Sequence, residues 1–167
     1  MLDSRAVTVV GAGVAGTWQA LLFQRAGFDV TVVERGDASL AGAAAYWAGG
    51  MLAPGCEAET AEPIVTRLGR RSLDLWRAHL PDVAVNGSLI VAHPRDRADY
   101  ERFARLTSGY ERVDAQRLGV LEPALAGRFR EGLFFPNEAH VEPRHVLPEL
   151  HKQLQTMGAV IRFNQAA

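Results

Sequence analysis

A glycine-rich turn near the N-terminus constrains the fold of this chain more than any other feature. The motif GAGVAG, residues 11–16, follows the short apolar run Ala6–Val10, which has the pattern of a buried parallel strand. Residues Val14–Ala26 then place apolar side chains at helical spacing, and Val30–Val33 is a second apolar run. This order predicts a strand–helix–strand unit with a right-handed crossover, of the kind that binds dinucleotides.

Each glycine of the motif has a physical role in such a unit. Gly11 permits the tight turn, Gly13 lets the backbone approach a pyrophosphate, and Gly16 lets the helix pack closely on the strand. The pyrophosphate is expected at the helix N-terminus, where unpaired N–H groups and the helix dipole favour an anion.

The acidic residue Glu34 lies at the end of the second predicted strand, 18 residues after Gly16. A carboxylate at this position can accept hydrogen bonds from ribose hydroxyls, and it would repel the 2′-phosphate of NADP. The motif alone does not separate FAD from NAD.

The segment AAAYWAGGMLAP, residues 43–54, favours FAD. Small residues let a backbone lie against a flat ring, and Gly49-Gly50 offers N–H groups with no side chain in the way. The structural alternative is a hydrophobic loop that covers the core. Tyr46 and Trp47 are large and apolar, so we expect them in the core rather than beside a cofactor.

Composition excludes several classes of protein. The 167 residues carry 18 basic and 19 acidic side chains, which gives no electrostatic reason to expect nucleic acid or an anionic membrane as a partner. No apolar run is long enough to span a membrane and the start does not have the pattern of a signal peptide, so the cytoplasm is the default expectation. The single cysteine, Cys56, excludes an intrachain disulfide and is expected to be a half-buried structural residue.

The rest of the chain alternates helices and strands. A doubly wound sheet needs more strands than the sequence provides, so we expect the N-terminal part of a larger protein. The predicted helices are Pro63 to about Leu80, Pro94–Leu106, Asp114–Leu121 and Pro143–Met157, and the predicted strands are Ser88–Ala92, Gly132–Phe135 and Ala159–Phe163.

Taken together, these features resemble the FAD-dependent glycine oxidases of the thiamine-synthesis type, within the D-amino-acid oxidase superfamily. The resemblance covers nearly the whole chain in the right order, and GGMLAP followed by acidic residues is its most specific part. It rests on GAGVAG, Glu34-Arg35, GGMLAP with Glu57 and Glu59, LEPAL at 121–125, HVEP at 140–143 and GAVI at 158–161.

The resemblance implies an α/β fold in which a Rossmann-like FAD-binding domain is interleaved with a substrate domain built on an antiparallel sheet. Residues 1–83 and 136–167 would belong to the FAD-binding domain, and residues 84–135 would begin the substrate domain. It places Val14 and Ala15 at the pyrophosphate, Glu34, Arg35 and Ala167 toward the adenosine, Ala44 and Ala45 between phosphate and flavin, and Gly49, Gly50 and Met51 at the flavin ring.

The activity implied by the resemblance is oxidation of the amine of glycine, or of a related small amino acid, to an imine. Molecular oxygen would reoxidise the flavin and release peroxide, and the imine would serve thiamine thiazole formation. In the family the arginine that binds the substrate carboxylate comes from the C-terminal half, so we assign no catalytic residue here and expect residues 1–167 alone to be inactive. His140 and His145 are five residues apart, which does not suit metal ligation from a helix, and we assign no metal.

Several alternatives stay open at this point. Within the enzyme class, they are a D-amino-acid dehydrogenase and a sarcosine-type oxidase, because the residues that read the substrate are not assigned. Outside it, the chain could be a non-catalytic remnant or a subunit completed by a second polypeptide. Assembly into a homo-oligomer also stays open.

Overall fold

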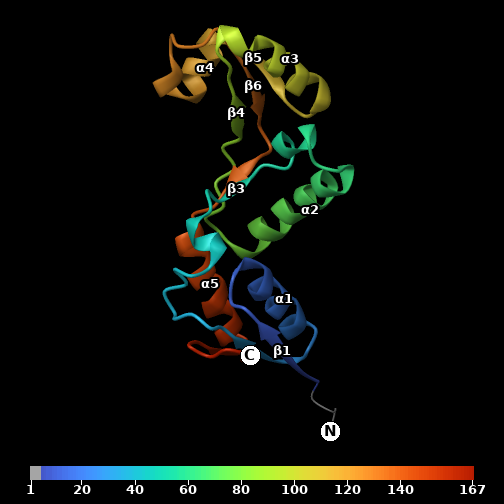
Figure 1. Ribbon diagram of the computed structural model, residues 1–167, viewed down its shortest axis with the longest axis vertical. Coiled ribbons are helices and arrows are strands. Elements are labelled where there is room, and N and C mark those ends of the chain that lie inside the picture. The colour runs from blue at the N-terminus through green and yellow to red at the C-terminus, as the bar shows by residue number, and fades with distance from the viewer. Residues whose placement is uncertain (1–4) are drawn as a thin grey trace. The chain divides into compact units, whose positions relative to one another are not determined.

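The computed structural model of the protein describes residues 5–167. These residues form two compact units, and Figure 1 labels their elements where there is room. Unit 1 combines the chain up to Gly50 with Glu142–Ala167, and unit 2 is Met51–Val141.

Unit 1 is built on a three-stranded parallel sheet. Its strands are β1 (Ala6–Val10), β2 (Asp29–Val33) and β8 (Val160–Arg162), in the order β1-β2-β8. Strands β1 and β2 pair in parallel along their whole length, and helix α1 (Val14–Arg25) connects them. The predicted strand–helix–strand unit is therefore present, with the glycine motif between β1 and α1.

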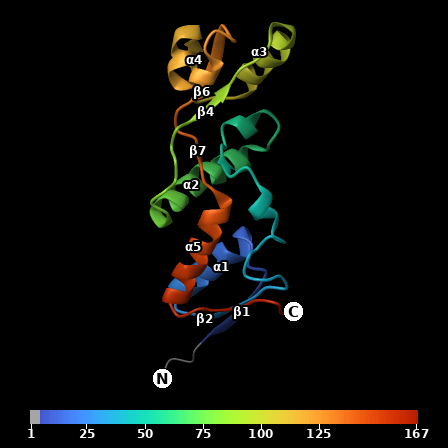
Figure 2. The same cartoon turned by 90° about the vertical axis from the view of Figure 1, so that its left-hand side faces the viewer.

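Helices α1 and α5 (Pro143–Thr156) pack side by side in unit 1, as Figures 1 and 2 show. The side-chain amide of Gln24 donates a hydrogen bond to the carbonyl of Met157, at 2.8 Å, and so links the ends of the two helices. Helix α5 starts at Pro143 as predicted and runs through Pro148. The largest apolar side chains buried in this unit are Leu21, Val32, Leu147, Leu150 and Leu154.

Unit 2 contains a three-stranded antiparallel sheet. Strands β4 (Ser88–Ile90), β6 (Glu131–Phe135) and β5 (Glu111–Asp114) lie in the order β4-β6-β5. Strand β5 has one apolar residue, Val113, so no hydrophobic pattern predicts it. Its strand conformation depends on pairing with the apolar strand β6.

Two further strands of unit 2 are very short and were also not predicted. Strand β3 (Met51–Leu52) pairs antiparallel with β7 (Ala139–His140), and a single bridge adds Ala84 to His140. A two-residue strand carries too little pattern to be read from sequence, because its position is fixed by a partner that is distant along the chain.

Unit 2 also contains three helices, at the positions that the sequence predicts within a few residues. They are α2 (Pro63–His79), α3 (Arg97–Leu106) and α4 (Ala115–Leu121). Helix α3 packs on the sheet, and one buried cluster joins them: Tyr100, Ala104, Leu133 and Phe135.

The fold class agrees with the sequence: a parallel βαβ unit is interleaved along the chain with an antiparallel sheet. The two units are defined by internal contacts, whereas the predicted domains are defined by what they bind. The assignment of residues 1–83 and 136–167 to FAD and of 84–135 to the substrate therefore stays a prediction. Of the helices within residues 5–167, none combines the length and the apolar composition that a membrane crossing requires.

Candidate functional site

The turn between β1 and α1 has the geometry that the glycine motif predicts. Gly11 has φ +99°, and its N–H donates to the carbonyl of Val33 at 2.8 Å, which ties the turn to the end of β2. A Cβ atom on Gly16 would lie 1.9 Å from the carbonyl oxygen of Gly11. Gly11 is therefore required by its backbone conformation, and Gly16 by the close packing of the helix on the turn.

Gly13 is different, because the protein leaves space beside it. It is the N-cap of α1 with φ −71°, and the nearest described atom to an added Cβ would be the Cβ of Ala43, at 4.0 Å. Among residues 5–167 no side chain caps this helix end, and its first turn holds no acidic residue. The N–H groups at Val14 and Ala15 thus begin a helix whose positive end is open to an anion.

Ala12, in the middle of the motif, is held through both of its backbone polar groups. Its N–H donates to Oε2 of Glu34 at 2.8 Å. Its carbonyl accepts from the Thr17 hydroxyl at 3.0 Å and lies 2.9 Å from Nε2 of His151. Three side chains, one directly after β2, one from α1 and one from α5, therefore fix the conformation of the turn.

Glu34 lies where the sequence predicts a ribose-binding carboxylate, directly after β2. Its Oε1 accepts the N–H of Gly36 at 2.8 Å, and its Oε2 accepts that of Ala12. These two hydrogen bonds keep the pKa of Glu34 below its usual value, with a smaller contribution from the exposed Arg35. Because a carboxylate has about four acceptor positions, Glu34 can still accept hydrogen bonds from hydroxyl groups.

His151 is a member of this site that sequence reasoning missed. It is buried on α5, and its Nε2 also lies 3.0 Å from the hydroxyl oxygen of Thr17. Burial lowers the pKa of His151, although the hydrogen bond to Ala12 and the nearby Glu34 carboxylate act in the opposite direction. One feature of the sequence could have indicated His151: it lies between Leu147 and Leu154 on the apolar stripe of the helix. A polar side chain in such a buried position needs a hydrogen-bond partner.

The end of the chain runs beside Glu34. The N–H of Gln165 donates to the carbonyl of Glu34, and that of Asn164 donates to the carbonyl of Gly36, each at 2.9 Å. Ala167, the predicted last contact of FAD, follows two residues later and is exposed. Sequence positions 34 and 164–167, far apart along the chain, are thus brought to one edge of unit 1.

The segment after β2 reaches the open end of α1 through Ala43. Ala44 and Ala45 begin a short 3₁₀ helix, η1 (Ala44–Trp47), with Ala44 exposed and Ala45 half-buried. The expectation that Trp47 lies in the core is wrong: it is 69% exposed, and its indole N–H donates to the carbonyl of Ala41 at 2.8 Å.

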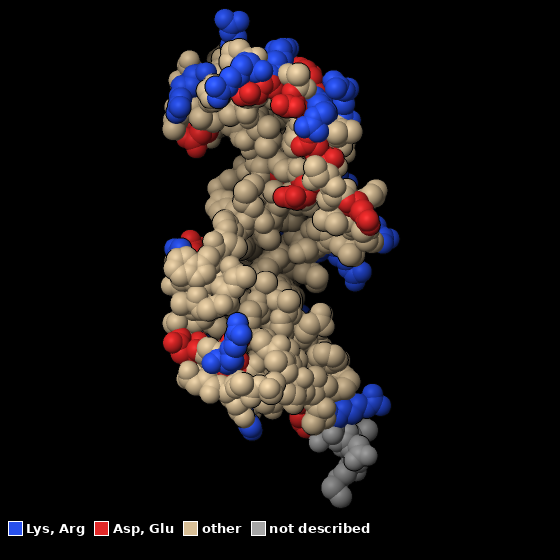
Figure 3. All heavy atoms as spheres, viewed as in Figure 1, with Lys and Arg blue, Asp and Glu red and all other residues tan. Residues whose placement is uncertain are grey.

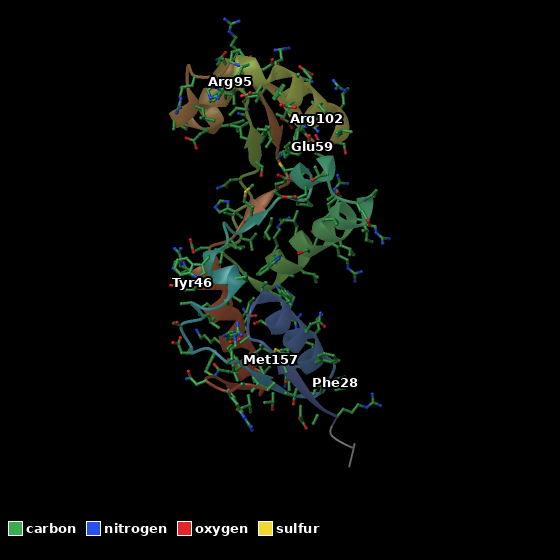
Figure 4. All side chains as sticks on the ribbon, in the orientation of Figure 1. Phe28, Tyr46, Glu59, Arg95, Arg102 and Met157 are labelled. Atoms are coloured by element: carbon green, nitrogen blue, oxygen red, sulfur yellow. The ribbon has the colours of Figure 1, made fainter. Side chains whose placement is uncertain are left out.

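Tyr46, which Figure 4 labels, is half-buried and contacts two other side chains. Its ring lies 5.2 Å from that of Trp47, and the guanidinium carbon of Arg144 lies 5.3 Å from the ring centroid. These contacts fix Tyr46 against the start of α5, within unit 1.

The predicted flavin-ring residues divide between the two units. Gly49 is exposed and Gly50 has φ +67°, and both belong to unit 1. Met51 begins β3 of unit 2, where it pairs with His140. The structure thus gathers the motif glycines, Val14, Ala15, Glu34 and the loop to Ala45 in unit 1, and it places Met51 in the other unit.

No group of three His, Cys, Asp or Glu side chains within residues 5–167 is arranged to hold a metal ion. His140 is exposed in β7, and His145 is exposed in the first turn of α5. The candidate site therefore consists of backbone donors, one carboxylate and one buried imidazole, a set that suits binding of a phosphate-bearing nucleotide.

Comparisons with known proteins agree with this geometry. Residues 6–167 match the family described as FAD dependent oxidoreductase. Over 161 residues the chain is 49% identical to a protein of Rhizobium etli provisionally named thiamine biosynthesis oxidoreductase ThiO, covering 92% of this chain and 49% of that protein.

Solved structures show the same fold at lower identity. A glycine oxidase from Geobacillus kaustophilus superposes with a TM-score of 0.77 at 20% identity, covering 96% of this chain and 47% of that one. An iminodiacetate oxidase from a Chelativorans species superposes with a TM-score of 0.71 at 23% identity, covering 95% and 46%. The chain thus spans about half the length of the relatives that it matches.

Proposed function

The chain belongs to the family of FAD-dependent oxidoreductases, and on that premise we propose that it supplies the FAD-binding residues of an amino-acid oxidase. The proposed substrate is glycine or a related small amino acid, whose amine is oxidised to an imine with release of peroxide. A role in thiamine thiazole formation is part of the proposal and is supported by the 49% identity to the Rhizobium etli protein named ThiO.

The open N-terminus of α1 beside Gly13 is the observation that carries this proposal. The residues present fit FAD, because the turn leaves space at Gly13 and no side chain within residues 5–167 caps the helix. A pyrophosphate would accept the free N–H groups of the first turn, including those of Val14 and Ala15. Glu34 would bind the ribose through the acceptor positions that its two backbone hydrogen bonds leave free.

The remaining predicted contacts are proposed in the same way. Arg35 and Ala167 would lie toward the adenosine, and Ala44 and Ala45 along the path to the flavin. Gly49, Gly50 and Met51 would contact the ring. When bound, FAD supplies an acceptor for the hydride that leaves the carbon next to the amine. The contribution of this chain is to bind and orient the cofactor, and to hold the turn through Glu34 and His151.

We extend the proposal to the domains. Residues 1–83 and 136–167 would form the FAD-binding part, and residues 84–135 would begin the substrate-binding part. The antiparallel order β4-β6-β5 supports the second assignment, because the resemblance implies a substrate domain built on an antiparallel sheet.

The test has two arms. The first measures FAD binding to residues 1–167 by flavin fluorescence, with Gly13→Ala as the matched variant. The second measures peroxide release from glycine, sarcosine and D-alanine, both for residues 1–167 and for the longest polypeptide that the gene produces. We expect turnover of glycine by the longest polypeptide and no turnover by residues 1–167.

The outcomes separate the proposal from its alternatives. Amine oxidation that reduces an artificial electron acceptor but releases no peroxide would indicate a dehydrogenase. A preference for sarcosine or D-alanine over glycine would overturn the proposed substrate. FAD binding without reduction by any amine would indicate a non-catalytic protein or a subunit that needs a second polypeptide.

A further inference from the structure

Unit 2 contains a cavity of about 540 Å³ that shares no residue with the candidate FAD site. It lies where the start of α3 meets the loop that leads into β6, with the first residue of α4 in its wall. The volume falls in the range of small-molecule sites, about 300–1,000 Å³. The side chains that bear on its chemistry are Arg97, Tyr100, Arg128, Phe129, Arg130 and Glu131.

The cavity wall has an excess of positive charge. Nη1 of Arg97 lies 2.8 Å from Oε1 of Glu131, so these two charges offset one another. Arg128 and Arg130 are exposed, and neither forms an ion pair within the described part of the chain. Figure 3 shows basic side chains gathered at the end of unit 2 that carries α3 and α4. Two guanidinium groups are therefore available to a ligand.

Tyr100 forms part of the same wall and has an unused hydroxyl group. The residue is 5% exposed, and its hydroxyl oxygen is buried without a hydrogen-bond partner among the described residues. Burial, followed by the nearby Glu131 carboxylate, raises the pKa of Tyr100, so the hydroxyl stays protonated and can donate. A buried hydroxyl without a partner costs about 1–3 kcal/mol, which makes this position unusual unless something binds there.

Phe129 gives the cavity an apolar side. Its ring is half-buried and lies 5.3 Å from the ring of His93, which also lines the cavity. The combination of an aromatic surface with nearby cationic donors is suited to a ligand that has both an apolar part and an anionic group.

We propose that this cavity binds a phosphate monoester, with Arg128 and Arg130 on the phosphate, Tyr100 donating to it, and Phe129 against the organic part. A phosphate monoester carries a charge of about −1.5 to −2 at neutral pH, which matches two unpaired guanidinium groups better than a carboxylate does. Paired N–H donors of arginine also fit the geometry of phosphate oxygens. The proposal goes beyond FAD binding and amine oxidation, and neither depends on it.

The test is calorimetric titration of residues 1–167 at low ionic strength with phenyl phosphate, inorganic phosphate and benzoate. We expect phenyl phosphate to bind with the lowest Kd. The double variant Arg128→Ala/Arg130→Ala should raise that Kd by about tenfold or more, since each charge-assisted hydrogen bond is worth about 1.5–3 kcal/mol. The matched control is Arg67→Ala/Arg71→Ala, which removes two exposed arginines of α2 that do not line the cavity.

Tyr100→Phe separates ligand binding from a structural role. Because the hydroxyl has no partner, its removal should leave Tm unchanged or higher while raising the Kd for phenyl phosphate about three- to tenfold. Four results would overturn the proposal: no binding of phenyl phosphate, equal binding of benzoate or inorganic phosphate, equal weakening in the α2 control, and a lowered Tm with unchanged Kd in Tyr100→Phe.

Discussion

The carboxylate of Glu34 accepts a hydrogen bond from the backbone N–H of Ala12, with 2.8 Å between Oε2 and the nitrogen. The two residues are 22 positions apart, so this bond joins the end of β2 to the turn after β1. Oε1 of the same side chain binds the N–H of Gly36. Glu34 therefore holds the turn in place and, in the proposed complex, also binds the ribose.

Glu34→Ala should weaken FAD binding about ten- to hundredfold, because it removes charge-assisted hydrogen bonds to the ribose and to the turn. In the longest polypeptide, kcat at saturating FAD should change far less. Flavin fluorescence titration gives the Kd, and Asp37→Ala, which removes an exposed carboxylate three residues away, serves as the control. A large loss of kcat with unchanged affinity would contradict the placement of Glu34 at the ribose.

Gly16→Ala should destabilise unit 1 by about 1–3 kcal/mol or more, as overpacked substitutions do. The added Cβ would lie 1.9 Å from the carbonyl oxygen of Gly11, so either the turn or the helix has to move. Thermal unfolding followed by circular dichroism measures the loss. A variant as stable as the parent would show that α1 can shift freely against β1.

Unlike Gly16→Ala, Gly13→Ala should affect FAD binding more than stability. Its Cβ would be in ordinary contact with Ala43 at 4.0 Å and φ at this position is −71°, so only the weaker capping by alanine should cost stability, by about 1 kcal/mol or less. FAD affinity should fall, because a methyl group would occupy the open space at the helix N-terminus. Equal FAD affinity in the parent and in Gly13→Ala would contradict a pyrophosphate at this position.

Much of unit 1 was predictable because its elements carry strong local patterns. The apolar runs of β1 and β2 and the glycines between β1 and α1 fix the strand–helix–strand unit without reference to the rest of the chain. By contrast, β5 has one apolar residue and exists through its pairing with β6. Such a strand is defined by its partner, which a local pattern does not reveal.

The candidate site likewise combines residues that a local pattern predicts with residues that only the fold brings together. The positions of Gly11, Gly16 and Glu34 follow from spacing along one segment, and the structure brings them together through short hydrogen bonds. His151 comes from a helix more than a hundred residues later, and only the fold shows that it meets Ala12. Trp47 was wrongly expected in the core, because hydrophobicity does not show that a 3₁₀ turn directs the ring outward.

His151 should make the stability of unit 1 depend on pH. Burial lowers its pKa in the folded state, whereas the unfolded chain has an ordinary value near 6.5. As pH falls below about 6.5, the unfolded state takes up a proton that the folded state resists, so stability should decrease until the pH reaches the folded pKa. Above about pH 6.5 His151 should add no pH dependence.

The variant His151→Gln tests this effect, because glutamine can still donate to the carbonyl of Ala12 but does not titrate. Tm of the parent should fall more than that of the variant between about pH 7 and about pH 5. Glu34 does not interfere, since a carboxylate with a lowered pKa loses its contribution only at more acidic pH. The control is His145→Gln, which replaces an exposed histidine on the same helix.

Half-buried Cys56 and buried Glu138 form a contact in unit 2 that affects thiol reactivity. The thiol donates to Oε2 of Glu138 at 3.1 Å, while Oε1 accepts the N–H groups of Gly55 and Cys56 at 2.7 and 3.0 Å. Burial, together with the hydrogen bond to Glu138 and the charge of that carboxylate, raises the pKa of Cys56 to about 12. At neutral pH the thiol is therefore protonated, and only the thiolate reacts with alkylating reagents.

Alkylation of Cys56 by iodoacetamide should be at least about a hundredfold slower at neutral pH than that of an unhindered cysteine, whose pKa is near 8.5. Glu138→Gln should lower the pKa and speed the reaction, because it removes the negative charge while its amide oxygen can still accept the N–H of Gly55. Glu57→Gln should have a smaller effect, because the charge of the Glu57 carboxylate contributes least to raising the pKa of Cys56. The pH dependence of the alkylation rate measures both variants, with circular dichroism to confirm that they are folded. If Glu138→Gln left that profile unchanged, burial alone would set the thiol pKa, and Glu138 would act only by holding the backbone of Gly55 and Cys56.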